Sequence, residues 1–335
     1  MGRSFVSRLA LSSCLCAVVA LSPAGVRAAA QPADKVSSSL YAHVATLPDR
    51  VGGEGLISVS FDRVKGRLYA VSNLGLYWVD ANEEKPVWKG PMFKAQLTRV
   101  ECAPDLGRVF FAGRETVGYV DVNALETPHA IARVWASDLV YEPSRKEIYV
   151  AYRAPRLQVF SAVTGERSGS VELPSWEGQS LEAIPGRVFL TLPTKSGLYA
   201  IDAASHHIGP WKVTGKLVTP AFLEADPSGR YLFASYHQNI VAIDTATAAI
   251  VGRVVSGSTP SIAFDPGSGL LVATYIEGPA PQKVGAFKVD AKGLTLVGAF
   301  ENPGLGTAGV EPTTNGFIQR GAHSLLVWSM NHSTK

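Results

Sequence analysis

A turn followed by an apolar strand recurs seven times along this chain of 335 residues. The turn carries Gly-Arg or a close variant, and the seven copies begin at Gly66, Gly107, Lys146, Gly186, Gly229, Gly269 and, more faintly, Gly321. Successive copies start 41, 39, 40, 43, 40 and 52 residues apart, which is the interval of four short strands that form one blade of a β-propeller. We therefore expect an all-β, seven-bladed β-propeller over residues 31–335.

Each repeat is predicted to contain four strands separated by turns. In the fifth repeat the strands are expected at Ala221–Ala225, Tyr231–Tyr236, from Val241 onward and at Ile250–Val255. A short acceptor side chain ends the third strand of most repeats and is expected to bond backbone N–H groups of the following turn. These acceptors are Asp80, Asp121, Ser161, Asp202, Asp244 and Asp290.

The last repeat lacks outer strands, because the chain ends soon after Leu325–Trp328. Residues 41–47 near the other end can supply one of them. Pairing the two ends in one sheet would close the ring and remove a free edge, so we expect the seventh blade to combine both. The inserts 277–282 and 302–306 are rich in Gly and Pro and are predicted loops.

The first thirty residues have the pattern of an export signal. Arg3 and Arg8 precede an apolar run over residues 9–21, and Ala28–Ala30 supplies the small residues that a signal peptidase reads. The run has 13 residues, fewer than the roughly 18 needed to span a bilayer as a helix. We expect residues 1–30 to be removed and the mature protein to be exported, either periplasmic or secreted, and not integral to a membrane.

A lipoprotein signal is an alternative reading, since Leu11–Cys14 resembles a lipobox. Without residues 1–30 the chain keeps 28 basic and 28 acidic residues, so it has no basic footprint for nucleic acid. Cys102 is then the single cysteine, which excludes an internal disulfide. It lies in an apolar strand and is expected to be a buried, inert thiol.

The fifth and sixth repeats resemble a known family. Val241–Thr247 is followed by Val251–Val254, Gly257, Pro260 and Ala263–Pro266, and this succession is similar to the YVTN-type β-propeller repeat family, which shares its fold with quinoprotein amine dehydrogenase subunits. The resemblance is carried by strand and turn residues and covers residues 37–335. It implies an exported binding or scaffold protein, and a periplasmic redox accessory subunit is one alternative, although no cofactor ligand can be assigned.

Tyrosines recur at one register of the repeat, where the second strand ends. Propeller ligands usually bind near the channel mouth, on the face that carries the turns between second and third strands. An aromatic ring beside Arg or His can stack on a ligand and hydrogen-bond to it. We therefore predict a recognition surface formed by Arg114, Tyr152, Arg153, Tyr236, His237 and Tyr275.

Acidic residues lie in the predicted innermost strands. Converging carboxylates could hold a cation such as calcium, which takes six to eight oxygen ligands. The alternative is that these carboxylates are solvated or paired with arginines such as Arg99. The candidates are Glu101, Asp138, Glu182 and Glu224.

A metal-dependent lactonase is a further alternative. Gly53–Gly55, with Glu54 as metal ligand, and the following Gly66–Tyr69 resemble the opening of gluconolactonase-like propellers. The Asn and Asp ligands that those enzymes need later are not supplied by Ala221–Leu223 or Ala234–Tyr236. We therefore expect a non-catalytic, exported propeller that binds a partner protein or small ligand on its channel-mouth face, with no cofactor assigned.

Overall fold

The computed structural model describes residues 41–330 except 49, 52, 82, 84, 153, 176–179, 193–196, 216, 218–219, 257–260, 276–282, 291–292, 302–309, 313–315 and 321–323. The expected signal sequence, residues 1–30, and the candidate Arg153 lie outside the described residues. No helix of the described residues is long and apolar enough to cross a membrane.

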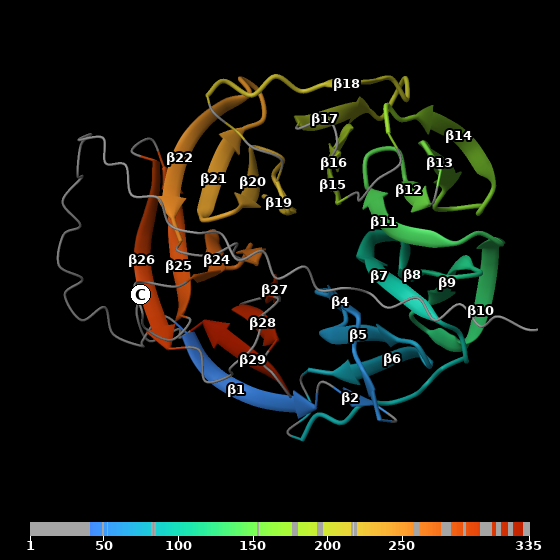
Figure 1. Cartoon of the computed structure of the whole chain (residues 1–335). Coiled ribbons are helices and arrows are strands. Elements are labelled where there is room, and N and C mark those ends of the chain that lie inside the picture. The colour runs from blue at the N-terminus through green and yellow to red at the C-terminus, as the bar shows by residue number, and fades with distance from the viewer. Residues whose placement is uncertain are drawn as a thin grey trace, which may run out of the picture. The chain divides into compact units, whose positions relative to one another are not determined.

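Antiparallel sheets form a ring of seven blades, which confirms the predicted seven-bladed propeller (Figure 1). Blades 2 to 6 each use four consecutive strands. Blade 2 has β7 (Leu97–Ala103), β8 (Arg108–Gly113), β9 (Val117–Asp121) and β10 (Ala124–Ala132), and blade 3 has β11 (Ala136–Glu142), β12 (Glu147–Tyr152), β13 (Arg156–Ser161) and β14 (Arg167–Glu172). Blade 4 has β15 (Leu181–Ile184), β16 (Arg187–Leu192), β17 (Gly197–Asp202) and β18 (Ile208–Pro210). Blade 5 has β19 (Phe222–Ala225), β20 (Tyr231–Tyr236), β21 (Asn239–Asp244) and β22 (Ala249–Val255), and blade 6 has β23 (Ile262–Asp265), β24 (Leu270–Tyr275), β25 (Lys283–Asp290) and β26 (Gly293–Glu301).

Blade 7 joins the two ends of the chain, as predicted. Its strands are β27 (Val310–Pro312), β28 (Gly316–Arg320), β29 (Ser324–Met330) and, outermost, β1 (Tyr41–Pro48). Strand β1 pairs antiparallel with β29 from Tyr41 opposite Met330 to Pro48 opposite Ser324. The innermost strand β27 contacts β23 on one side and β4 of blade 1 on the other.

Blade 1 differs from the predicted four-stranded unit. Its sheet has three strands, β4 (Ser58–Asp62), β5 (Arg67–Ser72) and β6 (Gly75–Asp80). A single bridge replaces the fourth strand, because Trp78 and Lys89 exchange backbone hydrogen bonds of 3.0 and 2.8 Å. The short strands β2 (Arg50–Val51) and β3 (Glu54–Gly55) form a separate hairpin, and a 3-10 turn, η1 (Pro104–Leu106), joins β7 to β8.

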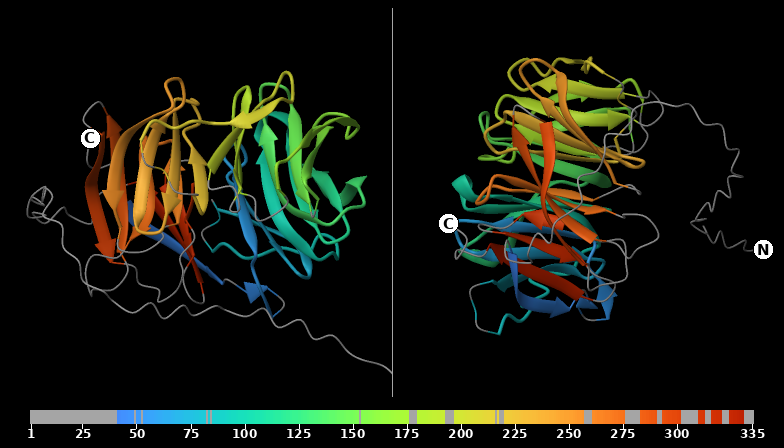
Figure 2. Two further views of the ribbon diagram at one scale, coloured as in Figure 1. Left: turned by 45° about the horizontal axis from the view of Figure 1, so that its top comes forward. Right: turned by 90° about the vertical axis from the view of Figure 1, so that its left-hand side faces the viewer.

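The strands run between two faces of the ring, which the tilted and side views show (Figure 2). The upper face is defined here by the turns that join second to third strands and by the connections between blades. The lower face carries the turns that join first to second and third to fourth strands. Antiparallel order puts each class of turn on its own face.

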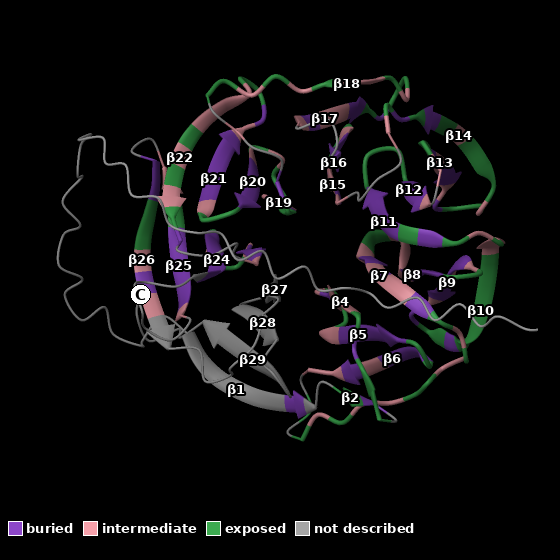
Figure 3. Ribbon diagram, viewed as in Figure 1, coloured by how far each residue is buried: buried purple, intermediate pink, exposed green. Residues whose placement is uncertain are grey.

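The core lies between blades and inside each sheet. Buried residues fill the sheets and exposed ones follow the outer strands (Figure 3). Each cluster of buried side chains joins two neighbours: one packs Val71 of blade 1 against Val109 of blade 2, and another packs Val159 of blade 3 against Val188 of blade 4. Fully burying a side chain of this size contributes about 1.5–3 kcal/mol.

The Gly-Arg signature of the repeat has a structural role at the lower face. Arg67 Nη1 donates to the carbonyl oxygen of Val122 in blade 2 at 3.0 Å, and Arg187 Nη1 donates to that of Thr245 in blade 5 at 3.1 Å. Arg108 Nη1 donates to Ala162 and Val163 of blade 3, both at 2.6 Å. Each arginine begins a second strand and reaches the turn after the third strand of the next blade, so it fastens adjacent blades.

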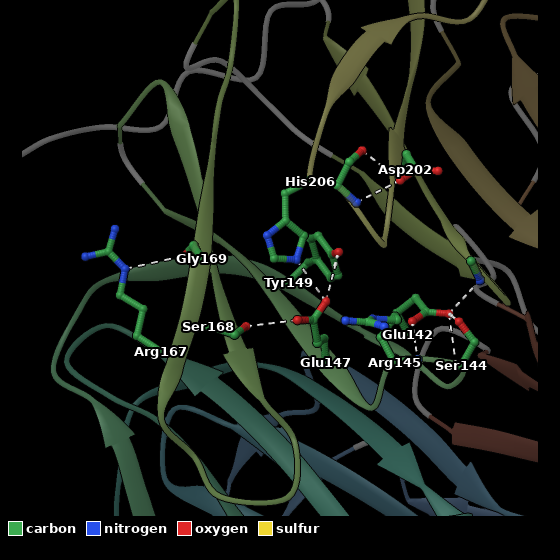
Figure 4. Close-up of polar contacts among 12 residues, drawn as sticks. Glu142, Ser144, Arg145, Glu147, Tyr149, Arg167, Ser168, Gly169, Asp202 and His206 are labelled. Atoms are coloured by element: carbon green, nitrogen blue, oxygen red, sulfur yellow. Dashed lines mark hydrogen bonds and ion pairs between the residues drawn. The ribbon is translucent and has the colours of Figure 1, made fainter.

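Blade 3 carries Glu147 at the corresponding position (Figure 4). Its carboxylate is 7% exposed and lies 3.0 Å from His206 Nε2 in the turn of blade 4. Ser168 Oγ donates to it at 3.0 Å and the Tyr149 hydroxyl at 3.2 Å. A charge-assisted hydrogen bond between Glu147 and His206 thus joins blades 3 and 4. Blades 1 and 2, 2 and 3, and 4 and 5 are instead joined by an arginine that donates to a carbonyl oxygen.

Three of the six acceptors predicted to end third strands, Ser161, Asp202 and Asp244, bond to turn N–H groups as expected. Asp244 Oδ1 accepts from the N–H groups of Ala246 and Thr247 at 3.1 and 2.9 Å, and Asp202 Oδ1 accepts from the N–H of Ser205 at 2.8 Å. Ser161 Oγ does the same for the N–H of Thr164 at 3.1 Å. Hydrogen bonds from Ser205 lower the pKa of Asp202, and hydrogen bonds from Thr247 lower the pKa of Asp244.

We expect Arg108→Met to destabilise the propeller by about 1.5–3 kcal/mol, because the buried Ala162 carbonyl loses a charged donor. Urea unfolding followed by tryptophan fluorescence measures this change. Arg145→Met, at an exposed arginine whose side chain has no hydrogen bond to the described residues, is the matched control. Equal midpoints for the two variants would contradict a fastening role.

Candidate functional site

Large apolar side chains are exposed on the upper face. They lie in connections between blades, in a turn after a second strand, or at strand ends that reach this face. They are Ile57, Leu74, Trp135, Phe222 and Val255. Among the described residues, the lower-face turns expose Val64, Val87 and Val163, none of which is aromatic. Aromatic residues with nearby arginine are enriched in protein interfaces.

A cavity of about 600 Å³ opens at the upper edge of blade 2. It lies between the connection that enters β7, the β8–β9 turn and the outer strand β10. Phe93 and Phe111 form its apolar wall, with ring centroids 4.7 Å apart. Lys94, Arg114, Glu115 and Arg133 bring three cations and one carboxylate to its lining. We call this cavity the blade-2 pocket.

Close backbone packing holds Arg114 at this pocket. The Arg114 N–H donates to the carbonyl oxygen of Gln96 at 3.0 Å, and the Gly113 N–H donates to that of Thr116 at 2.8 Å. A Cβ at position 113 would lie 2.2 Å from the Gln96 carbonyl oxygen, so only glycine fits there. The Arg114 guanidinium lies 5.6 Å from the centroid of the Trp135 ring, which is 40% exposed.

The predicted tyrosine register is only partly a surface feature. Tyr236 is 3% exposed and packs in the core shared by blades 4 and 5, which removes it from the recognition surface. Tyr152 is half-buried and its hydroxyl accepts hydrogen bonds from Arg156 and Gln158 of the same hairpin. Tyr275 ends β24, and its side chain lies outside the described part of the chain.

Two other predicted residues are accessible on the upper face. His237 is exposed in the turn between β20 and β21, where its φ is 47°. Arg114 is exposed at the blade-2 pocket. Sequence reasoning missed Phe93, Lys94 and Arg133 of the pocket because they lie in connections, which have no counterpart in the repeat. The adjacent aromatic and basic residues Phe93 and Lys94 were the one sequence pattern that could have indicated this pocket.

The predicted carboxylates converge in the channel, near the lower face. Glu101, Glu182 and Glu224 line a cavity of about 590 Å³ together with Arg63 and Arg99. Asp138 lies 3.1 Å from Arg99 Nε. Glu54 is exposed in the β2–β3 hairpin and does not line this cavity.

Two of these acids hold the innermost strand of the following blade. Asp138 Oδ2 accepts from the Leu181 N–H of blade 4 at 3.1 Å, and Glu224 Oε1 accepts from the Phe264 N–H of blade 6 at 3.0 Å. Ser60 Oγ does the same for Cys102 of blade 2 at 3.1 Å. These side chains satisfy N–H groups of strand edges that have no neighbouring strand on the channel side.

Burial shifts the ionisation of the channel residues. It raises the pKa of Glu182 well above the ordinary value, and the charges of Glu224 and Glu101 add to this rise. Burial also raises the pKa of Asp138, against the opposing charge of Arg99, and lowers the pKa of Arg63.

No three His, Cys, Asp or Glu side chains of the described residues are grouped so as to hold a metal ion. Of the four channel acids, Asp138 has the ion pair with Arg99 that the Arg-paired alternative predicts, and Cys102 is buried as predicted.

Glu182→Gln is expected to raise the melting temperature above pH 6. A raised folded-state pKa means that ionisation opposes folding once the pH exceeds the ordinary value of 4.5, and glutamine cannot ionise. The gain should disappear near pH 4, where the wild-type carboxyl is protonated in both states. Calorimetry from pH 4 to 8 measures it, with exposed Glu126→Gln as control. A gain that did not change with pH would contradict the assignment.

No protein-family model matches the chain, and comparison with curated proteins finds no similar sequence. Solved structures do match. A chain of the mitotic checkpoint complex aligns with a TM-score of 0.70 at 15% identity, over 94% of this chain and 99% of that one. The WD40 β-propeller domain of Doa1 aligns at 0.67 and 12% identity, over 88% and 98% of the two chains, and U3-55K at 0.66 and 6%, over 86% and 98%. At these identities the likeness shows the β-propeller fold, which the chain shares with WD40 propellers.

Proposed function

We propose that this chain is a non-catalytic binding propeller whose partner is a protein that docks on the upper face. The observation that carries the proposal is the gathering of exposed apolar residues, Trp135 and Phe222 among them, on the face that also presents Arg114 and His237. Tryptophan and arginine dominate the binding energy of protein interfaces. Docking proteins on a rigid propeller face agrees with the fold of the structural neighbours, one of which comes from a multi-protein complex.

The channel is not part of this proposal. Asp138 pairs with Arg99 and accepts from the Leu181 N–H, and Glu224 accepts from the Phe264 N–H, so these two acids serve the assembly of the ring. Glu54, the ligand that a lactonase-like site would need, lies apart in an exposed hairpin. A small ligand in the blade-2 pocket is the alternative, whereas the exposed Trp135 and Phe222 outside this pocket favour a protein.

Trp135→Ala and Phe222→Ala are each expected to weaken partner binding by about 2 kcal/mol, or roughly thirtyfold, because aromatic anchors dominate interfaces. A photo-crosslinking residue placed at Leu74, Trp135 or Phe222 in producing cells should identify the partner as a discrete adduct. Val64 and Val163, exposed on the lower face, are the control positions. Adducts from the lower face alone would overturn the proposal.

We also propose that the protein acts outside the cytoplasm and belongs with the exported YVTN-type propellers that its repeats resemble. The basis is the signal pattern of residues 1–30. Cleavage after Ala30 predicts a mature N-terminus at Gln31, which N-terminal sequencing of the protein from its producing cell would detect. A lipid-modified Cys14 would favour the lipobox alternative, and an uncleaved cytoplasmic chain would contradict export.

A further inference from the structure

The blade-2 pocket combines an apolar wall with three basic side chains and a single acidic one. Phe111 is 2% exposed and belongs to the core shared by blades 1 and 2, and Phe93 packs on that core from the connection. The wall is therefore rigid. An aromatic or branched side chain that entered would meet the Phe93 ring, which Phe111 supports from the core, so its ordering would require little rearrangement of the protein.

The cations at the rim are available to a ligand. Lys94, Arg114 and Arg133 are exposed, and none of them forms an ion pair with the described residues. Glu115 is the one carboxylate in the lining. A pocket with three cations to one anion favours a negatively charged occupant, and guanidinium groups bind carboxylates through paired hydrogen bonds.

The shape of the pocket favours a chain segment. It extends from the connection at 93–96 to Pro128 and Ala130 of β10, which is the outermost strand of blade 2. Its volume of about 600 Å³ is in the range of about 300–1,000 Å³ typical of ligand sites. It is also continuous with the proposed docking face, because Arg114 lies between the pocket and Trp135.

From these observations we infer that the blade-2 pocket receives an acidic peptide segment of the partner, with one aromatic or branched apolar side chain between Asp or Glu residues. The apolar side chain packs against Phe93, and the flanking carboxylates pair with Lys94, Arg114 and Arg133. This inference rests on the proposed function and names the chemistry of the partner at one place on the face.

Panning a random library of displayed 12-residue peptides on the full mature protein tests the inference. We expect enriched peptides to place Asp or Glu within two positions of Phe, Tyr, Trp or Leu. Synthetic forms of these peptides should bind the double variant Arg114→Glu/Arg133→Glu at least tenfold more weakly than the wild-type protein. Peptides whose Asp and Glu are replaced by Asn and Gln should bind the wild-type protein at least tenfold more weakly than the original peptides. Raising the salt concentration should weaken binding as well.

Two further variants keep the result interpretable. Arg145→Glu reverses an exposed arginine on the lower face and should leave binding unchanged, whereas Ala130→Trp fills the pocket without altering a charge and should abolish it. Circular dichroism and thermal unfolding confirm that each variant folds. Enrichment of peptides without acids, no enrichment, or unchanged binding to the charge-reversed variant would overturn the inference. Persisting adducts from Trp135 and Phe222 in that variant would show that the docking face itself stands.

Discussion

Burial of apolar surface between neighbouring blades is the constraint on which the rest of this structure depends. One four-stranded sheet cannot cover its own faces, and each cluster of buried residues draws on two adjacent blades, as Val71 and Val109 or Val159 and Val188 illustrate. A linear row of such sheets would leave two uncovered ends. Pairing of β1 with β29 joins the ends in one blade and lets the row close.

Polar contacts then specify how neighbouring blades meet. On the lower face, arginines that begin second strands donate to carbonyl groups one blade further on. Along the channel, Ser60, Asp138 and Glu224 accept from N–H groups of the next innermost strand. Because these contacts occupy the lower turns and the channel wall, the upper face is left as the surface on which side chains can serve recognition instead of assembly.

The repeat made the fold predictable from sequence, since Gly-Arg turns and strand-ending acids such as Asp202 and Asp244 recur wherever the geometry recurs. It predicted the site poorly for the same reason. Tyr236 shares the register of Tyr152 but packs in the core, because the path of the next connection decides what covers a strand end. Arg133 and Phe93 lie in connections, whose sequences are not repeated, and only the folded chain brings them to one pocket.

Blade 1 shows the same limit, since a single Trp78–Lys89 bridge stands where periodicity predicts a strand. Glu101, Glu182 and Glu224 of the innermost strands line the channel cavity, and Glu224, like Asp138, accepts from a backbone N–H group of the next blade. Periodicity reports where a residue lies along a strand, and it does not report whether that residue faces a ligand or the next blade.

The exchange of arginine for Glu147 between blades 3 and 4 makes the sectors of the ring distinguishable from one another. A carboxylate cannot donate to a carbonyl group, so Glu147 requires donors, and His206, Ser168 and Tyr149 supply them (Figure 4). The junction between blades 3 and 4 is therefore chemically unlike those that join an arginine to a carbonyl group, and an arginine at position 147 would meet the His206 ring instead of a carbonyl oxygen.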